Sequence, residues 1–366
     1  MDVAKGLLEL AMPSPVRING LGIAAPDTVC SSQDGLEIAR AAETPLDRDE
    51  LAKLYSDVRI DSRSLLFGSR ALQERIIEPV RQGGASTSQR LEHYRPAALA
   101  LASRSARAAL ASAQVDPERI THLVTVSCTG AESPGVWRGL HDELELPNDV
   151  ARANIGFMGC HGALNGLAAA RAFAAENPSN VVLLVCVEIC SIHYHVAAPL
   201  RDQAVANAIF ADGAASAVVS RDHHGPVLDC FTSRLFPGTS DLMTWRIGDR
   251  GFEMRLSPRV PIVLKRSVSE WITTWLGERG LCIGDIGSWA IHPGGRDILE
   301  GVRRGLGLSE PLLAPSLGVL AEQGNMSSST VLWILKKLLD GGGRLPTVAM
   351  AFGPGLVGEG VLLTDR

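Results

Sequence analysis

The chain alternates between two kinds of hydrophobic pattern. Between several short apolar runs lie longer alanine- or leucine-rich stretches in which apolar residues recur with a helical spacing. The short runs are rich in Val, Ile and Leu and are typical of β-strands. They occupy residues 121–128, 180–189, 216–220, 288–293, 347–352 and 360–365. This alternation predicts an α/β fold.

One helical stretch, residues 96–114, carries apolar residues on all sides and opens with Pro96. Proline is favoured at the first position of a helix, because its missing N–H would have no partner there in any case. A helix that is apolar all round is buried. The sequence therefore predicts a buried helix that begins at Pro96.

The chain also divides into two halves of similar outline. The polar, turn-forming segment RDHHGPVLD, residues 221–229, separates them, so we place one half at residues 1–224 and the other at 225–366. Each half ends in a glycine-containing turn followed by an apolar strand. In α/β sheets, ligands bind outside the carboxyl ends of the strands, so the turns of both halves are expected to meet at one site.

Composition narrows the class of protein. The 366 residues are 46% hydrophobic, which is enough for two packed halves with a large core. The formal charge is −5 and no block of like charge occurs, so neither nucleic acid nor an anionic membrane surface is expected as a partner. No apolar run reaches the ~18 residues that a membrane span needs.

Cysteine usage and the start of the chain indicate a reducing compartment. Seven cysteines, an odd number scattered along a long chain, argue against a disulfide framework. The first fifteen residues include Asp2 and Glu9 and do not read as a signal peptide, so we predict a cytoplasmic protein. The histidines at 193–195 and 223–224 have no second cluster with metal-site spacing, and no metal is predicted.

Cys160 lies where a strand-like approach ends and a run of strong helix formers begins. The dipole and free N–H groups of a helix N-terminus favour a thiolate, which would make this cysteine a nucleophile. The alternative is a buried packing residue, the usual role of a free cysteine. His292 ends an apolar run just before a Pro-Gly-Gly turn, where it could serve a site or bond backbone groups.

Asn325 precedes three serines and an apolar helix in the segment EQGNMSSSTVLWILKKLL. Asparagine or serine at this place is a natural N-cap, which is the simpler interpretation. Together, however, a thiol, an imidazole and an amide can hold an acyl group and stabilise an oxyanion or enolate. We therefore treat Cys160, His292 and Asn325 as one candidate site.

Residues 353–360, GPGLVGEG, have the letters of a dinucleotide-binding fingerprint. That fingerprint requires a helix after the glycines, whereas strand-like residues lie on both sides of this segment. We predict a tight turn here instead.

Seven segments together give the chain a specific resemblance. They are THLVTVSCTG, the Gly-Cys pair at 159–160, VCVEICS, FADGAAS, IHPGGRDIL, AEQGNMSSSTVLWIL and AFGPGLVGEG. From about residue 95 to the C-terminus, their order and content resemble the type III polyketide synthases, the chalcone synthase-like family. The resemblance implies a thiolase-like fold, a five-layered αβαβα sandwich of two duplicated halves, acting as a homodimer. It also implies an acyltransferase that uses an acyl-CoA starter and malonyl-CoA without a further cofactor.

The resemblance assigns roles to the three candidate residues. Cys160 matches the family's nucleophile, and His292 and Asn325 match the groups that bind the thioester carbonyl of malonyl-CoA. His292 is expected to hold Cys160 as a thiolate by ion pairing. The acyl chain is then extended by iterative decarboxylative Claisen condensation and cyclised to an aromatic or pyrone product.

Further residues are expected to line the substrate cavity. Phe210 and Met254 match two gatekeepers between the CoA tunnel and the cavity, with Met254 in place of a phenylalanine. Trp245 stands where the family has a glycine, and its bulk is expected to shorten or redirect the cavity. Ser133 replaces a methionine that reaches into the partner's cavity. The other cavity candidates are Thr129, Cys190, His193, Ser327, Gly353, Pro354 and Gly355.

Arg59, Arg63 and Arg296 are candidates for binding the CoA phosphates at the tunnel mouth, because guanidinium groups suit phosphates. The alternative for each is an ordinary surface arginine.

Other functions stay open at this point. A ketoacyl-ACP synthase III shares the fold and the three residues but condenses once onto a carrier protein, and the motifs GNMSS and FGPG favour the polyketide branch. A papain-like hydrolase is a more remote alternative, because its Cys-Trp signature is missing and His161 follows Cys160. A non-catalytic binding protein is disfavoured by the presence of all three chemical groups.

Overall fold

The computed structural model describes residues 14–42, 46–196, 201–222 and 224–365. Residues 1–13 lie outside these ranges, and with them most of the stretch that we do not read as a signal peptide. Residue 223, in the segment between the halves, also lies outside them. The strands are β1 (Arg17–Ala24), β2 (Val29–Ser31), β3 (Ser62–Ser64), β4 (His122–Ser127), β5 (Ala151–Gly156), β6 (Val182–Ile189), β7 (Asp212–Ser220), β8 (Val227–Leu235), β9 (Met243–Gly248), β10 (Gly251–Leu256), β11 (Ser288–Ile291), β12 (Thr347–Gly353) and β13 (Val357–Thr364). The α-helices are α1 (Ser32–Ala41), α2 (Arg48–Val58), α3 (Ser69–Leu72), α4 (Glu78–Arg81), α5 (Thr87–Ala113), α6 (Trp137–Glu143), α7 (Gly162–Glu176), α8 (Arg201–Ile209), α9 (Val260–Gly277), α10 (Arg296–Leu306), α11 (Ala314–Gln323) and α12 (Thr330–Asp340).

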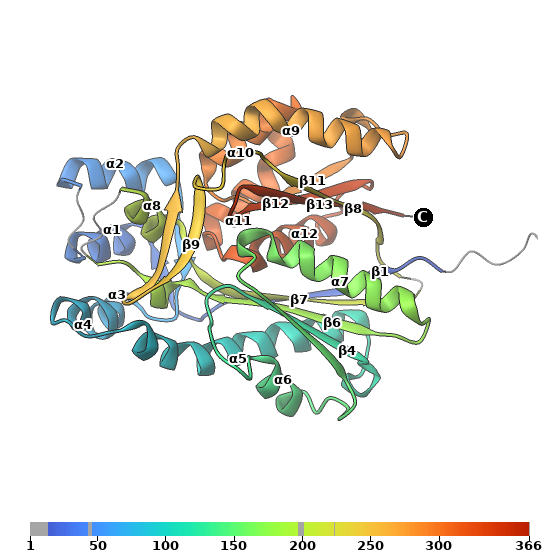
Figure 1. The fold of residues 1–366 in the computed structure, drawn as a ribbon, viewed down its shortest axis with the longest axis horizontal. Coiled ribbons are helices and arrows are strands. Elements are labelled where there is room, and N and C mark those ends of the chain that lie inside the picture. Colours follow the sequence, from blue (N-terminus) through green and yellow to red (C-terminus); the bar gives the residue numbers. More distant parts are fainter. Residues whose placement is uncertain (1–13, 43–45, 197–200, 223, 366) are drawn as a thin grey trace, which may run out of the picture.

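Two blocks of strands are stacked in the molecule, with helices between and outside them (Figure 1). Helices α7 and α12 lie between the blocks. Helices α5 and α6 cover the outer face of one block, and α9 and α10 cover the outer face of the other. The order from one side to the other is helix, sheet, helix, sheet, helix, and the predicted five layers are confirmed.

Hydrogen bonding links nine strands, but the two blocks are nearly separate sheets. One block has the order β5-β4-β6-β7-β1, and the other has the order β8-β13-β12-β11. The register that joins them, between β1 and β8, consists of the single pair Arg17–Val227. Strands β4, β5 and β6 are parallel, as are β11 and β12. Each block therefore has an edge of carboxyl strand ends, where ligands bind in such sheets.

The six predicted strand runs correspond to β4, β6, β7, β11, β12 and β13. Strand β6 reads VLLVCVEI, and all eight residues are buried because helices cover both faces. Small residues of α7 allow close packing on it: a Cβ atom on Gly166 would come within 2.7 Å of Leu184. The predicted tight turn is shorter than residues 353–360, because β13 already begins at Val357.

The predicted start of the buried helix at Pro96 is wrong. Helix α5 begins nine residues earlier at Thr87, where the Ser86 side chain accepts from the Gln89 N–H and Gln89 bonds back to the Ser86 N–H. This capping box stabilises the true N-terminus. Pro96 lies inside the helix, where eleven buried residues of α5 hold it against the sheet.

The hairpin β9–β10 forms a two-stranded sheet apart from the large one. It contacts α8, α5 and the turn after β6, Cys190–His193, so a segment of the second half lies against the first half. In the described part of the chain, no helix combines the length and the apolar character needed to cross a membrane.

Candidate active site

Cys160 lies in a 3₁₀ turn, Gly159–His161, between the end of β5 and the first residue of α7. Gly159 has a φ of 75°, and a Cβ atom there would lie 2.3 Å from Pro354 Cδ. A Cβ atom on Gly353 would likewise lie 2.4 Å from His161 Cδ2. Because both positions are glycine, the cysteine turn of one half and the Gly-Pro-Gly loop of the other can interlock. This contact brings the two halves together at Cys160.

Asn325 is held by backbone bonds that also cross between the halves. Its N–H donates to Ile209 O at 2.8 Å, and its carbonyl accepts from Ala211 N at 2.9 Å, so it pairs with Phe210. Its side-chain Oδ1 accepts from Ser327 N at 2.8 Å. Asn325 therefore bonds to the first residue of the short 3₁₀ turn Ser327–Ser329, whose N-cap is Met326, and it does not cap α12. The buried Nδ2 donor has no hydrogen-bond partner among the described residues.

His292 directly follows β11 and is fully buried. Its N–H donates to Met350 O on β12 at 2.8 Å, which fixes the residue at the carboxyl end of two parallel strands. Both ring nitrogens are buried and have no partner within the described ranges. Unpaired buried polar atoms are costly, and at a site they are groups prepared for a ligand.

Burial shifts the pKa values of Cys160 and His292 in opposite directions. It raises the pKa of the Cys160 thiol to about 12, and the buried Glu188 carboxyl raises it further, while the Ser327 and Asn325 side chains lower it. Burial, and then the charge of His161, lower the pKa of His292 to about 3. Cys160 Sγ lies 3.9 Å from Ser327 Oγ. Burial thus disfavours each charge separately, so the expected thiolate–imidazolium pair must draw on the attraction between its members.

Glu188, at the end of β6, is a residue that the sequence analysis did not assign. Its fully buried carboxyl accepts hydrogen bonds from Ser328 Oγ at 2.5 Å, Thr129 Oγ1 at 2.8 Å and Cys128 N at 3.0 Å. Burial raises its pKa. The signal in the sequence was a single glutamate inside an otherwise apolar strand. It ties together the loops that flank Cys160.

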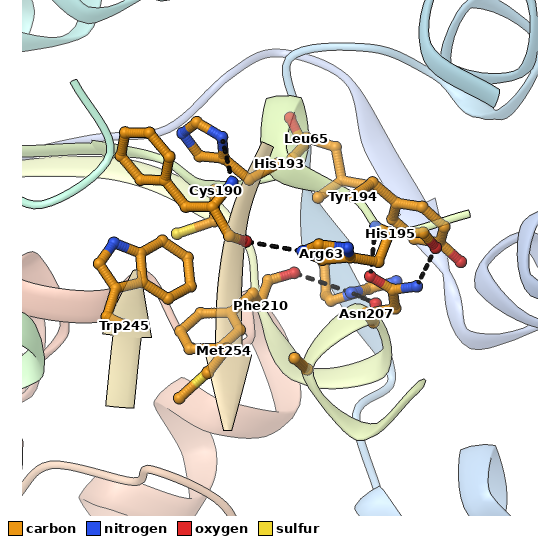
Figure 2. A pocket seen from close by; sticks show the side chains of 13 residues that line it. Arg63, Leu65, Cys190, His193, Tyr194, His195, Asn207, Phe210, Trp245 and Met254 are labelled. Carbon is orange, nitrogen blue, oxygen red and sulfur yellow. Dashed lines mark hydrogen bonds between the residues drawn. The ribbon is translucent and has the colours of Figure 1, made fainter. Parts of the chain in front are cut away.

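Two small cavities adjoin the site. The one at Cys160 encloses about 20 Å³, and the one behind it about 30 Å³. Four residues border both and form a partition: Cys190, Phe210, Trp245 and Met254. Figure 2 shows the second cavity, with Trp245 and Met254 on one side and Tyr194, His195 and Asn207 on the other.

The other cavity candidates fall into three groups. Thr129, Ser327 and Pro354 line the Cys160 cavity, and His193 lines the second one. Gly353 and Gly355 flank Pro354 in the loop. Ser133 is exposed and borders neither cavity of this chain.

The three arginine candidates do not lie together. Arg59 and Arg296 line a third cavity of about 260 Å³, with Arg59 exposed at the end of α2 and Arg296 at the first position of α10. Arg63 is buried, and its Nη1 donates to the carbonyls of Asn207 and Phe210, both at 2.7 Å. This corrects the prediction for Arg63, which holds the backbone at Phe210 and is not available to a phosphate.

No group of three or more His, Cys, Asp or Glu residues in the described ranges has the geometry to hold a metal ion.

Comparisons with known proteins show the family of the chain. The chain matches the family models of the chalcone and stilbene synthases, the N-terminal domain over residues 13–223 and the C-terminal domain over residues 227–365. The chain belongs to the type III polyketide synthases.

Two related proteins illustrate the range of this polyketide synthase family. The chain is 32% identical to the alpha-pyrone synthesis polyketide synthase-like protein Pks18 of Mycobacterium tuberculosis, over 99% of this chain and 94% of that protein. It is 29% identical to the 3,5-dihydroxyphenylacetyl-CoA synthase of Streptomyces toyocaensis, over 96% of this chain and 91% of that enzyme.

Solved structures show the same polyketide synthase fold. PKS-I of the brown alga Ectocarpus siliculosus matches with a TM-score of 0.89 and 30% identity, over 97% of this chain and 99% of that one. The 1,3,6,8-tetrahydroxynaphthalene synthase of Streptomyces coelicolor A3(2) matches with a TM-score of 0.87 and 25% identity, over 95% and 99%. The predicted thiolase-like fold is confirmed.

As a type III polyketide synthase, the chain is an acyltransferase that uses CoA thioesters and condenses malonyl-CoA iteratively. The comparisons favour this class over the ketoacyl-ACP synthase III and papain-like alternatives.

Proposed function

We propose that Cys160 receives the starter acyl group and that His292 and Asn325 hold the malonyl thioester during decarboxylation. The observation that carries this assignment is the buried, unpartnered state of both His292 ring nitrogens and of Asn325 Nδ2. The Asn325 side chain acts on the Cys160 thiol, and His161, next to Cys160 in the chain, acts on the His292 ring. Donors fixed in a dry site stabilise a developing oxyanion without having to reorganise.

The chemistry follows from these groups. His292 takes the thiol proton, and the Cys160 thiolate attacks the acyl carbonyl of the starter, releasing CoA as its thiol. Malonyl-CoA then loses carbon dioxide, and the electron pair of the broken C–C bond becomes an enolate whose oxygen accepts hydrogen bonds from His292 and Asn325. The enolate carbon attacks the acyl-cysteine, and the Cys160 thiolate leaves. The extended chain is then a CoA thioester, and the Cys160 thiolate attacks its carbonyl and releases CoA as its thiol. Each cycle thus lengthens the chain on Cys160 by one two-carbon unit.

We assign CoA entry to the cavity lined by Arg59 and Arg296. Its free space of about 260 Å³ is far larger than that of the two inner cavities, and the first turn of α10 adds the positive end of a helix dipole to the two guanidinium groups. Arg63 supports the same route indirectly, because it fixes the backbone of the gatekeeper Phe210.

A short polyketide is the product class that the cavity favours. The partition at Trp245 leaves little free space beside Cys160. Pks18, a relative over nearly the full length, has alpha-pyrone synthesis in its name. We therefore propose a short acyl starter and a product that closes to a pyrone or a single aromatic ring.

Two further proposals concern the whole chain. We place the boundary of the halves between residues 224 and 225, which is supported by the gap between β7, ending at Ser220, and β8, beginning at Val227. We also propose a cytoplasmic homodimer. Its cytoplasmic location is supported by the seven free thiols, and its dimer by an exposed edge strand, β5.

The test is a reaction of the purified chain with malonyl-CoA and a panel of acyl-CoA starters, without any carrier protein. Mass spectrometry should detect a free pyrone or resorcinol. A product that forms only when an acyl carrier protein is added would overturn the proposal.

A further inference from the structure

Two histidines hold the backbone of one residue in the cavity wall. His193 Nδ1 accepts from the N–H of Phe252 at 3.3 Å, and His195 Nε2 donates to the Phe252 carbonyl at 2.7 Å. Phe252 is fully buried in β10. The two side chains thus take both backbone polar groups of a single residue.

These groups belong to the free edge of a two-stranded sheet. Strand β10 pairs only with β9 in its sheet, and the Phe252 N–H and carbonyl point away from that partner toward the histidines. An unpaired buried edge would leave costly unsatisfied groups. His193 and His195 therefore form with the Phe252 backbone the two hydrogen bonds that a third strand would otherwise form.

The protonation state of His193 is fixed by its partners. Its Nε2 lies 2.7 Å from the Thr129 carbonyl, which can only accept, so Nε2 carries the proton and Nδ1 has a free lone pair. Burial lowers the pKa of His193 to about 3, which keeps the ring in this neutral form. A neutral ring can donate to Thr129 and accept from Phe252 at the same time.

Both histidines are themselves held rigidly. Buried Arg90 donates through Nη1 to the carbonyls of Ile192 at 2.8 Å and Tyr194 at 2.9 Å, on either side of His193. Asn207 bonds both backbone groups of His195, accepting from its N–H at 3.0 Å and donating to its carbonyl at 2.7 Å. The clamp is thus preorganised before any substrate enters.

The clamped strand carries the partition between the two cavities. The His193 and Phe252 rings stack at 4.0 Å, and the Trp245 ring meets each of them edge-on, at 6.1 and 5.8 Å between centroids. Trp245 pairs with Met254 across the hairpin, and its Nε1 donates to Cys128 O at 2.8 Å. Moving Phe252 would therefore move the wall against which Trp245 is packed.

We propose that His193 and His195 are positioning residues that set the depth of the acyl cavity by clamping Phe252, and that the clamp restricts the enzyme to short acyl starters. This inference rests on the proposed function. Without the clamp, the space behind Trp245 joins the Cys160 cavity and longer acyl chains fit.

The experiment compares His195→Leu, which removes the donor, with His195→Gln, whose amide can still donate to the Phe252 carbonyl. His193→Phe is a second variant that keeps the ring stack but loses both hydrogen bonds. His122→Leu is the matched control. His122 is a half-buried histidine at the first position of β4, whereas the cavity residues Cys128 and Thr129 follow the last position of that strand. For each protein, kcat and KM are measured with acetyl-, hexanoyl- and decanoyl-CoA, together with malonyl-CoA decarboxylation and thermal unfolding.

We expect His195→Leu and His193→Phe to raise the kcat/KM ratio of decanoyl- to acetyl-CoA about tenfold, the size of effect of one lost buried hydrogen bond. The ratio is measured within one protein, so a change in malonyl-CoA decarboxylation that is common to all starters does not alter it. The glutamine variant should restore the wild-type ratio, and His122→Leu should not change it.

The double variant that combines Trp245→Gly with His195→Leu should change the kcat/KM ratio of decanoyl- to acetyl-CoA by less than the product of the two single changes. Both substitutions act on the same cavity wall, so their effects are not independent. An unchanged starter preference in folded His195→Leu and His193→Phe, or full multiplicativity with Trp245→Gly, would overturn the clamp. Failure of the proposed function is distinguishable, because the wild-type chain itself would then not decarboxylate malonyl-CoA.

Discussion

At the scale of single residues, the site combines a thiol with donors that the protein leaves unpaired. Cys160, His292 and Asn325 are all buried, and burial opposes charge on the first two. Such a site is reactive only if its members charge together, through transfer of a proton from sulfur to imidazole. The burial that raises the thiol pKa also strengthens every hydrogen bond to an enolate.

The coupling of Cys160 to His292 has a testable sign. Burial raises the thiol pKa, and the Ser327 and Asn325 side chains lower it. In the proposed pair, an imidazole that accepts the proton lowers it further, so His292→Ala should leave the thiol pKa higher than in wild type. Alkylation of Cys160 by iodoacetamide at pH 7 should fall at least about tenfold, the effect of one pKa unit on thiolate population, and recover as the pH rises. Peptide mass spectrometry reports on this cysteine alone. A pH profile equal to that of wild type or of a His122→Ala control would contradict the pairing.

Asn325 supplies a donor to the enolate in this account. Asn325→Ala should lower malonyl-CoA decarboxylation by about a hundredfold, as loss of one oxyanion donor does. Asn180→Ala, which removes a half-buried amide from the loop before β6, is the control. A normal decarboxylation rate would leave Asn325 with its capping bond to Ser327 as its sole role.

At the scale of elements, the β9–β10 hairpin decides the shape of the cavity. It comes from the second half, packs on the first half and carries Trp245 and Met254 into the partition. The remaining walls come from strand ends, whose positions the large sheet fixes. Product differences within this fold can therefore arise from one hairpin while the catalytic residues stay in place.

Trp245→Gly removes most of the partition. Its indole lies between the two cavities, so the variant should unite them and yield longer chains or a different ring closure. Chromatography with mass spectrometry of the products checks this. The control is Trp333→Phe, because Trp333 is a half-buried tryptophan of α12 that lines neither cavity. An unchanged product profile would show that this side chain does not limit the cavity.

Sequence reasoning succeeded where the signal was local. Apolar runs predicted six strands, and the motifs predicted the fold class and the family. The start of α5 was predicted wrongly because Pro96 was taken as the first helical position, although the capping box at Ser86 marks the N-terminus. Arg63 and Glu188 were misjudged or missed because their partners, at Phe210 and Ser328, lie more than a hundred residues away. Burial of a charged side chain is decided by such long-range contacts.

At the scale of the whole molecule, one edge of the sheet is open. Strand β5 is the last strand of its block, most of its residues are exposed, and Phe157 and Met158 follow it with 45% and 36% of their surface exposed. Apolar side chains beside an unpaired strand mark an interface. A second copy of the chain, related by a twofold axis, is the occupant we propose.

Phe157→Glu places a charge in this interface. Wild-type protein should elute with about twice the 38.9 kDa mass of one chain in size-exclusion chromatography with light scattering, and the variant should shift toward the monomer. Ile262→Glu, at an exposed apolar residue on α9, is the matched control. A wild-type monomer, or an equally dimeric Phe157→Glu, would contradict this placement of the interface.

We propose that Cys160, one of seven cysteines, carries the growing chain. The most direct measurement is peptide mass spectrometry of the protein quenched after incubation with an acyl-CoA starter. We expect the acyl mass on the Cys160 peptide, no acylation in Cys160→Ala, and measurable malonyl-CoA decarboxylation in that variant. An acyl group on Cys128 or Cys190, or equal loading of Cys160→Ala and wild type, would contradict it.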